Sequence, residues 1–479
     1  LRGHAKISLL GKYSVGRVKS LNVYCQRTPL IRVLLVEILM PWPALLCELL
    51  AESIPLQDPA LGWKANHGAW CRLWIAIASG SAGSLFQVRA STPELSYQKM
   101  LGITIGTACG ATSTTILIAS LWVFPVPFCV VITGCLAATL FVIFFVATLM
   151  KRSERNICPK IMDPLKQKIF LIIAQAVLVV TYTIYSIVFT RCTYHQRLGL
   201  LILLPVMKIS LKQMIARLAS DDEESIPAVV VFSVDVFNGL YTSICMQSSG
   251  TWWASFLMIA LNGGYTVLSI LEINRAAALL SKLDRKNGIV PQVSHSIVPI
   301  LDACSHSSSL HKTQRCATSV KKLNAAASRS GKMTIKESKL AMSSKLLFYL
   351  EYRALVGYIE GIIPLMYAAY LSILVNLPSA KYYPHTRSLS SEQLNTTVGS
   401  IMAYASTENL SLLWLHVVVK RKLGFSLLYQ LAFVLETEAE LLQGRLFVWI
   451  VILLQLPLVH FGADFGFEFN WMKDEQDNR

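Results

Sequence analysis

The fold is decided by residues 128–150, which read FCVVITGCLAATLFVIFFVATLM and contain no charged residue. A hydrocarbon core about 30 Å thick is crossed by roughly twenty apolar residues in a helix. Lipid offers no partners for backbone N–H and C=O groups, so such a segment has to bond its backbone internally, as a helix does. This stretch therefore predicts a transmembrane helix.

Similar stretches lie on both sides of it. The weakest are the second, which holds the small polar run 79–84, and the sixth, which Lys208 and Lys212 interrupt. The pattern predicts an all-α polytopic integral membrane protein, a bundle of about ten or eleven transmembrane helices. In chain order the predicted spans are 30–50, 70–88, 101–124, 128–150, 169–190, 198–216, 226–247, 252–273, 350–377, 398–419 and 446–463.

Composition agrees with this class. Of 479 residues, 54% are hydrophobic and only 15% charged, against about 25% charged in soluble domains. The net charge of +16 comes from residues 1–29, with six Lys/Arg and no acid, and residues 274–345, with thirteen basic and three acidic residues. Basic segments beside apolar runs indicate cytoplasmic loops facing anionic lipid, so we expect no nucleic-acid partner.

The same charges orient the chain. With residues 1–29 in the cytoplasm, strict alternation puts most Lys and Arg of the short loops on that side as well, as the positive-inside rule requires. The pattern Asn395-Thr396-Thr397 is a glycosylation acceptor and falls in a loop assigned to the outside. We therefore expect a cytoplasmic N-terminus.

Five regions follow from these assignments. Their order is a basic cytoplasmic N-terminal segment (1–29), a first membrane bundle of about eight helices (30–273), a Ser/Lys-rich cytoplasmic loop (274–345), a second membrane segment (346–463) and an acidic tail (464–479). The Ser/Lys-rich loop is expected to be disordered and either binds anionic lipid headgroups or serves as a plain linker. The second membrane segment holds two or three helices plus residues 425–444, predicted as a helix that lies at the cytoplasmic interface or packs against the bundle; if these residues cross instead, the tail changes sides.

Ionisable residues inside predicted spans are the candidate site, because a charge at the bilayer centre has to be compensated. Asp235 and Asn238 are three residues apart and share one helical face. Glu360 lies near mid-span, where Gly357, Gly361 and Pro364 predict a kinked or interrupted helix. Two interpretations stay open: the three line a substrate or ion path, or they are packing contacts, with Arg353 as a partner for Glu360.

Three glycines, Gly102, Gly106 and Gly110, recur every four residues and predict a helix-packing face. The eleven cysteines include no Cys-x-x-Cys pair and indicate small buried hydrophobic side chains. No pattern matches a standard metal site or a catalytic motif. We expect neither a metal nor a cofactor, and no enzymatic activity.

Several stretches resemble a family of multi-pass membrane proteins of oomycetes that has no assigned activity. The likeness spans most of the chain and implies a membrane protein, with no implied mechanism. Asp235 and Asn238 lie within its motifs. The stretches that carry it are 24–66 (with IPLQDP and GWKAN), 229–249 (with VVVFSVDVFNGLY), 377–382 (LPSAKY) and 429–469 (with YQLAFVLET and VHFGADF).

Two classes of function follow. The first is a solute transporter or channel whose path for a small solute or ion passes Asp235, Asn238 and Glu360. The alternative is a membrane receptor or scaffold that acts through the basic loop 274–345, with purely structural carboxylates.

Overall fold

The computed structural model describes residues 13–90, 95–149, 192–219, 224–249, 252–286, 335–387 and 389–462, together with part of 174–189. The described residues form helices and connecting turns, with no β-strand among them. The predicted all-α fold class is confirmed. Predicted regions or spans at 1–12, 150–173, 287–334 and 463–479 lie outside the described residues.

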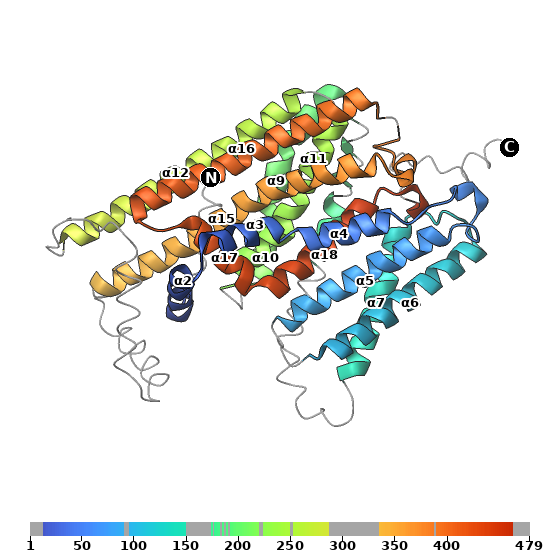
Figure 1. The fold of residues 1–479 in the computed structure, drawn as a ribbon, viewed down its shortest axis with the longest axis horizontal. Helices are drawn as coiled ribbons and strands as arrows, with labels where there is room; N and C mark the ends of the chain where they lie inside the picture. Colours follow the sequence, from blue (N-terminus) through green and yellow to red (C-terminus); the bar gives the residue numbers. More distant parts are fainter. Residues whose placement is uncertain are drawn as a thin grey trace.

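The helices form a bundle in which long elements run side by side (Figure 1). In chain order they are α2 (Val15–Arg27), α3 (Leu30–Leu39), α4 (Trp42–Glu52), η1 (Pro59–Leu61), α5 (His67–Arg89), α6 (Tyr97–Leu121), α7 (Cys129–Leu149), α9 (Tyr194–Leu218), α10 (Ile226–Val230), η2 (Val231–Asp235), α11 (Val236–Ser249), α12 (Trp252–Lys286), α15 (Ile335–Leu374), η3 (Pro378–Tyr382), α16 (Ser391–Leu423), α17 (Leu427–Thr437), α18 (Ala439–Gln455) and η4 (Val459–Phe461).

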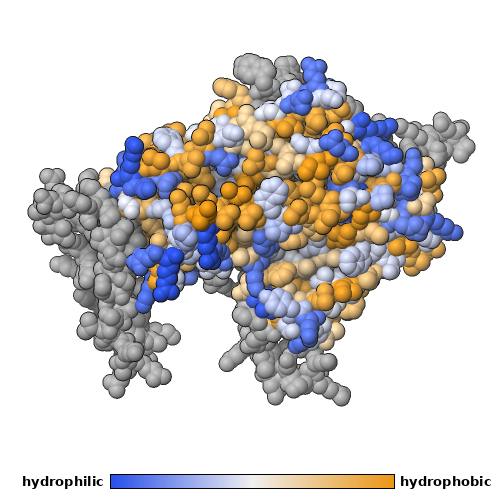
Figure 2. Space-filling model, in the orientation of Figure 1, coloured by the Kyte–Doolittle hydropathy of each residue, from blue (hydrophilic) through white to orange (hydrophobic). Residues whose placement is uncertain are grey.

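The surface is apolar over a broad band of the face in Figure 2, with hydrophilic side chains gathered toward its two ends. The stretch 129–148 is only 17% buried, whereas 226–247 is 94% buried. A helix as apolar as α7 with exposed Val131 and Ile143 needs lipid around it. The chain therefore has the build of a multi-pass membrane protein, with α10, η2 and α11 at its centre.

The number of long apolar spans is lower than the sequence predicts. Within the described residues, six segments are long and apolar enough to cross a bilayer: 30–52, 97–121, 129–148, 226–247, 256–275 and 343–374. The predicted spans 70–88, 198–216, 398–419 and 446–463 are helical, as α5, α9, α16 and α18, but fall outside this class. In α5 and α9 the charged side chains Arg72 and Lys212 interrupt the apolar run and pair inside the bundle. Helix α18 has only 17 residues.

Two predicted boundaries need correction. The loop 274–345, expected to be disordered throughout, is helical at both ends, because α12 continues to Lys286 and α15 begins at Ile335. Runs such as Ala276-Ala277-Ala278-Leu279-Leu280 are strong helix formers and extend the helix beyond its apolar part.

Residues 425–444 form two helices where the sequence predicts one, and the packing of α17 agrees with the predicted alternative of a helix against the bundle. They form α17 and the start of α18, with a turn at Glu438. All six residues of α17 from Gln430 to Leu435 are buried, and α17 packs on α2, α3 and α15. The helix predicted over 446–463 accordingly runs over Ala439–Gln455.

Candidate functional site

The most buried membrane segment contains a change of helix type. Between α10 and α11 the five residues of η2 adopt π-helical geometry, and Asp235 is the last of them. Single π-helical turns are rare and recur at functional sites. Arg445 of α18 supports this turn, because its Nη1 donates to the Val229 carbonyl at 3.3 Å and to the Ser233 hydroxyl.

Two lysines of α9 meet the carboxylate of Asp235. Lys208 Nζ lies 2.8 Å from Asp235 Oδ1, and Lys212 Nζ lies 2.7 Å from Asp235 Oδ2. Lys208 also donates to Glu360 of α15, and Lys212 donates to the Tyr352 hydroxyl at 3.0 Å. The structure thus brings Asp235 and Glu360 to one ammonium group, and we call Lys208, Lys212, Asp235 and Glu360 the central cluster.

Glu360 reaches the central cluster from an uninterrupted helix. The interruption predicted as one alternative at Gly357, Gly361 and Pro364 is corrected, since α15 is helical throughout with Pro364 inside it, while the kink predicted as the other alternative stays a prediction. The two glycines give room to α16: a Cβ on Gly361 would lie 2.7 Å from Asn409 Oδ1, and one on Gly357 would lie 3.2 Å from Leu412. The ion pair of Glu360 is with Lys208 and not with Arg353, the partner considered from the sequence.

Asn238 lies beside the same lysine. It lines a small pocket of about 10 Å³, roughly the space of one water molecule. The Asn238 side chain is 6% exposed, and its Oδ1 has no hydrogen-bond partner among the described residues. The other residues around the pocket are Leu204, Pro205, Lys208, Met258, Leu261, Asn262 and Tyr265.

A second buried group of charges lies where α4 and α5 meet η3. Arg72 and Glu52 pair at 2.7 Å with both side chains fully buried. Arg72 also donates to the carbonyls of Glu52 at 2.8 Å and Ile54 at 2.6 Å, while the Tyr383 hydroxyl donates to Glu52. We call this the Arg72 cluster, and Glu48, which accepts from Gln455 at 2.9 Å, lies on the same helix as Glu52.

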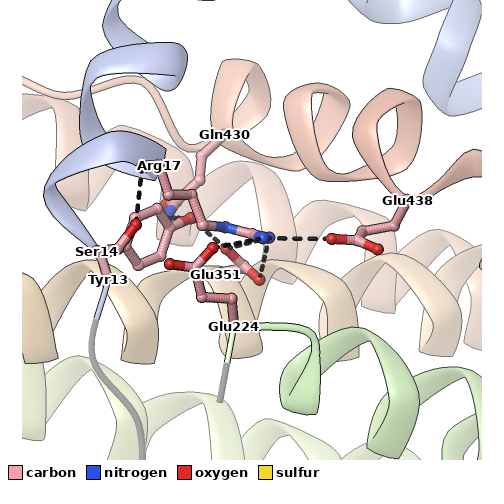
Figure 3. Close-up of polar contacts among 7 residues, drawn as sticks. All are labelled: Tyr13, Ser14, Arg17, Glu224, Glu351, Gln430 and Glu438. Carbon is pink, nitrogen blue, oxygen red and sulfur yellow. Dashed lines mark hydrogen bonds and ion pairs between the residues drawn. The ribbon is translucent and has the colours of Figure 1, made fainter. Parts of the chain in front are cut away.

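A third group fixes α2 to the bundle, and Figure 3 shows carboxylates converging on Arg17 from separate elements. The guanidinium lies 3.2 Å from Glu351 on α15, 3.3 Å from Glu438 and 3.8 Å from Glu224. The Tyr13 hydroxyl also donates to Glu351. Burial alone would lower the pKa of Arg17, but Glu351, Tyr13 and Glu438 raise it above its ordinary value. Arg17, which gives this Arg17 cluster its name, therefore stays ionised.

The remaining predicted residues lie elsewhere. A Cβ on Gly106 or Gly110 of α6 would meet Phe144 or Leu140 of α7 at 3.2 and 3.0 Å, whereas one on Gly102 would meet nothing within 4 Å. Asn395 is exposed, but it lies in α16, which begins at Ser391, and not in a loop.

A closer glycine contact escaped the sequence reading. A Cβ on Gly83 of α5 would lie 2.3 Å from the Gly444 carbonyl of α18, and one on Gly444 would lie 2.6 Å from the Gly83 carbonyl. The two glycines stand more than 300 residues apart, so no local repeat could have revealed them.

Sequence reasoning also missed the cations of the central cluster. Lys208 and Lys212 are visible in the sequence as interruptions of an apolar run, four residues apart and so on one helical face. That spacing was the available signal. The two carboxylates predicted in other spans, Asp235 and Glu360, need cations as partners inside the membrane, and two lysines on one helical face can supply them.

Comparison of this chain with models of known families, with curated proteins and with solved structures yields no match. The fold and the apolar surface define its class by themselves. It is an all-helical integral membrane protein of the multi-pass kind. Its resemblance to the oomycete membrane family stays a prediction.

Proposed function

We propose that this protein is an ion-coupled membrane transporter or channel whose path runs past Asp235, Asn238 and Glu360. The observation that carries the proposal is the sharing of Lys208 by two carboxylates from different helices, in the most buried part of the bundle. A buried ion pair seldom adds net stability over apolar packing. Charges kept in such a place favour a functional use.

Polar contacts follow α15 on both sides of the central cluster. Glu351 meets Arg17, Tyr352 meets Lys212, and the Tyr367 hydroxyl donates to Gln247 at 2.6 Å. The ring of Tyr370 follows at 6.2 Å from that of Tyr367, and its buried hydroxyl has no hydrogen-bond partner among the described residues. From residue 351 to 370 a helix rises about 28 Å, which is close to the roughly 30 Å thickness of the hydrocarbon core. Polar groups at these intervals support a route for charge.

The test is an electrical one that does not depend on which ion moves. Purified protein in vesicles fused to a planar bilayer should give a current under an ion gradient, and Glu360→Gln should abolish it. The matched control is Glu392→Gln, because Glu392 is exposed in the first turn of α16. An undiminished current in the Glu360 variant would remove this residue from the path.

We further propose a cytoplasmic N-terminus, contacts of the basic loop with anionic lipid, and transport in place of catalysis. The charge asymmetry of the short loops supports the orientation. Tags at 310 and at 388 should be accessible from opposite sides of the membrane. Accessibility from the same side would overturn the orientation. The receptor or scaffold alternative depends on loop 287–334, which lies outside the described residues.

A further inference from the structure

Side chains of the protein already occupy the places where a metal cation would bind. Between Asp235 and Glu360 stands the ammonium of Lys208. At the π-helical turn, the Val229 carbonyl accepts a hydrogen bond from Arg445. An incoming metal ion would have to displace a cation that is covalently attached to the chain.

The space beside Lys208 also excludes a coordinated metal ion. A hard cation such as Mg²⁺ or Ca²⁺ takes about six or more oxygen ligands, whereas the pocket of about 10 Å³ holds roughly one water molecule. Asn238 Oδ1 is a buried acceptor without a partner among the described residues. A water molecule or a hydrated proton would satisfy it, because buried acceptors are rarely left unpaired.

Glu408 of α16 adds a further carboxyl beside the central cluster. It is 3% exposed, and its carboxyl interacts with Asn262, Glu360 and Lys208. The next residue on each helix shows that α15 and α16 are in contact here, because a Cβ on Gly361 would lie 2.7 Å from Asn409 Oδ1. Asn262 also donates to the Tyr404 hydroxyl at 2.6 Å and lines the pocket. Asn262 therefore connects the pocket to Glu408.

The central cluster and Glu408 together are electrically balanced when one of their three carboxyls carries a proton. Lys208 and Lys212 balance Asp235 and Glu360, so an ionised Glu408 would add one uncompensated negative charge. Arg353 also acts on Glu408, but it is only half-buried, and no ion pair joins these two among the residues that the structure describes. An uncompensated buried charge is costly, and two neighbouring carboxyls commonly share a proton.

We infer that the ion carried by this protein is the proton, bound by Glu360 and Glu408 in exchange for the Lys208–Glu360 ion pair. This inference rests on the proposed function and names its ion. A hydronium ion in the pocket transfers its proton to a carboxylate oxygen, which forms an O–H bond and leaves one water molecule. Lys208 then keeps its pair with Asp235 alone. Release reverses the step on the other side of the membrane.

Among the described residues, the charged and titratable groups that face this site come from several elements. They are Lys208 and Lys212 on α9, Asp235 on η2, Arg353 on α15, Tyr404 and Glu408 on α16, and Tyr182 in the helical part of 174–189.

The experiment follows two ions in the same vesicles. Protein is reconstituted with a pH-sensitive dye inside, a potassium diffusion potential is imposed with valinomycin, and ²²Na⁺ uptake is measured in parallel. Proton uptake without sodium uptake is expected. Glu360→Gln and Glu408→Gln should each lower the proton flux by about tenfold or more, while Glu392→Gln on the same helix as Glu408 should leave it unchanged. Gel filtration in detergent verifies that each variant is folded.

Each outcome separates this inference from the proposed function. Sodium uptake that depends on Glu360, without proton uptake, would overturn the proton assignment and leave the transport function standing. Full proton flux in Glu408→Gln would remove Glu408 from the site. Absence of any ion current would refute the proposed function, and this inference with it.

A second pair of variants guards against misfolding of the glutamine forms. Glu360→Asp and Glu408→Asp keep a titratable carboxyl on a shorter side chain. Each should shift the pH at which the proton flux is half-maximal, because the distance from the carboxyl to Lys208 or Glu360 changes. An unchanged midpoint in both variants would contradict the proposal.

Discussion

The central cluster and the Arg72 cluster are both buried ion-pair groups, yet they are built differently. Arg72 is held at several points: the two terminal nitrogens of its guanidinium meet one carboxylate and two backbone carbonyls. Lys208 is shared: its ammonium bridges two carboxylates from separate helices, next to a pocket and an acceptor without a partner among the described residues. An arginine fork holds one geometry, whereas a lysine is a point charge on a flexible stem.

The difference teaches that burial alone does not mark a functional charge. The Arg72 cluster satisfies backbone groups at the junction of α4 and α5, and this is a structural task. The central cluster can lose one pair to a proton and keep the other. We therefore expect the two clusters to lose stability to different degrees when their cation is removed.

The largest loss of stability is expected for Arg72→Met. It leaves the Glu52 carboxylate without a cation, and it removes the Arg72 donor from the Ile54 carbonyl and from the Glu52 carbonyl, which keeps only the Ser379 hydroxyl at 3.2 Å. A carbonyl that loses its donor cannot be rescued by protonation. Breaking a buried pair in this way costs about 3–5 kcal/mol. In Lys208→Met the loss should be smaller, because Lys212 still pairs with Asp235 and Glu360 can take up a proton. Thermal unfolding in detergent measures both, and equal losses would erase the contrast between the clusters.

A smaller loss of stability than that of Arg72→Met is expected for Arg17→Gln, which tests the Arg17 cluster. The substitution removes the cation facing Glu351, while the Tyr13 hydroxyl still donates to that carboxylate. Hydrogen bonds to charged groups contribute about 1.5–3 kcal/mol, and we expect a loss in this range. The same unfolding measurement applies, with Lys19→Gln on the exposed side of α2 as the control. Matching values for the two variants would show that α2 is not held by Arg17.

The loop that carries Tyr383 should make stability sensitive to acid. Burial lowers the pKa of His385 to about 4, below its value of about 6.5 in an unfolded chain. Between these values the unfolded chain binds a proton that the folded one refuses, so stability is complete above pH ~6.5 and falls as the pH decreases toward 4. We expect a decrease on the order of 1–2 kcal/mol, measured as unfolding temperature against pH. His385→Gln should flatten that dependence; an unchanged slope would assign it to other groups.

The smallest effect is expected at the surface. Arg32 pairs with Glu436 at 2.9 Å, but its side chain is 62% exposed. Exposed pairs contribute about 0–1 kcal/mol, so Arg32→Gln should change the unfolding temperature little. A loss as large as that of Arg17→Gln would mean that exposure is the wrong criterion for ranking these clusters.

Most of the helices could be predicted, whereas the site could be predicted only in part. Asp235, Asn238 and Glu360 stand out because an ionisable or amide side chain in an apolar run is visible without any tertiary contact. The shared partner was not predicted: Lys208 was interpreted as an interruption of its span, and the one partner considered for Glu360 was Arg353 on the same helix. Lys208 and Glu360 are 152 residues apart, and nothing local in the sequence indicates that they meet.

The sequence by itself determined that this chain is helical and lies in a membrane, because the transfer of apolar side chains and backbone groups into lipid depends on each segment alone. Only the tertiary structure decided which charges pair, where the π-helical turn falls, and that Gly83 and Gly444, not Gly102, allow the closest approach of two helices. Those features depend on the relative positions of whole helices, and these positions are set by packing between segments that the chain order keeps far apart.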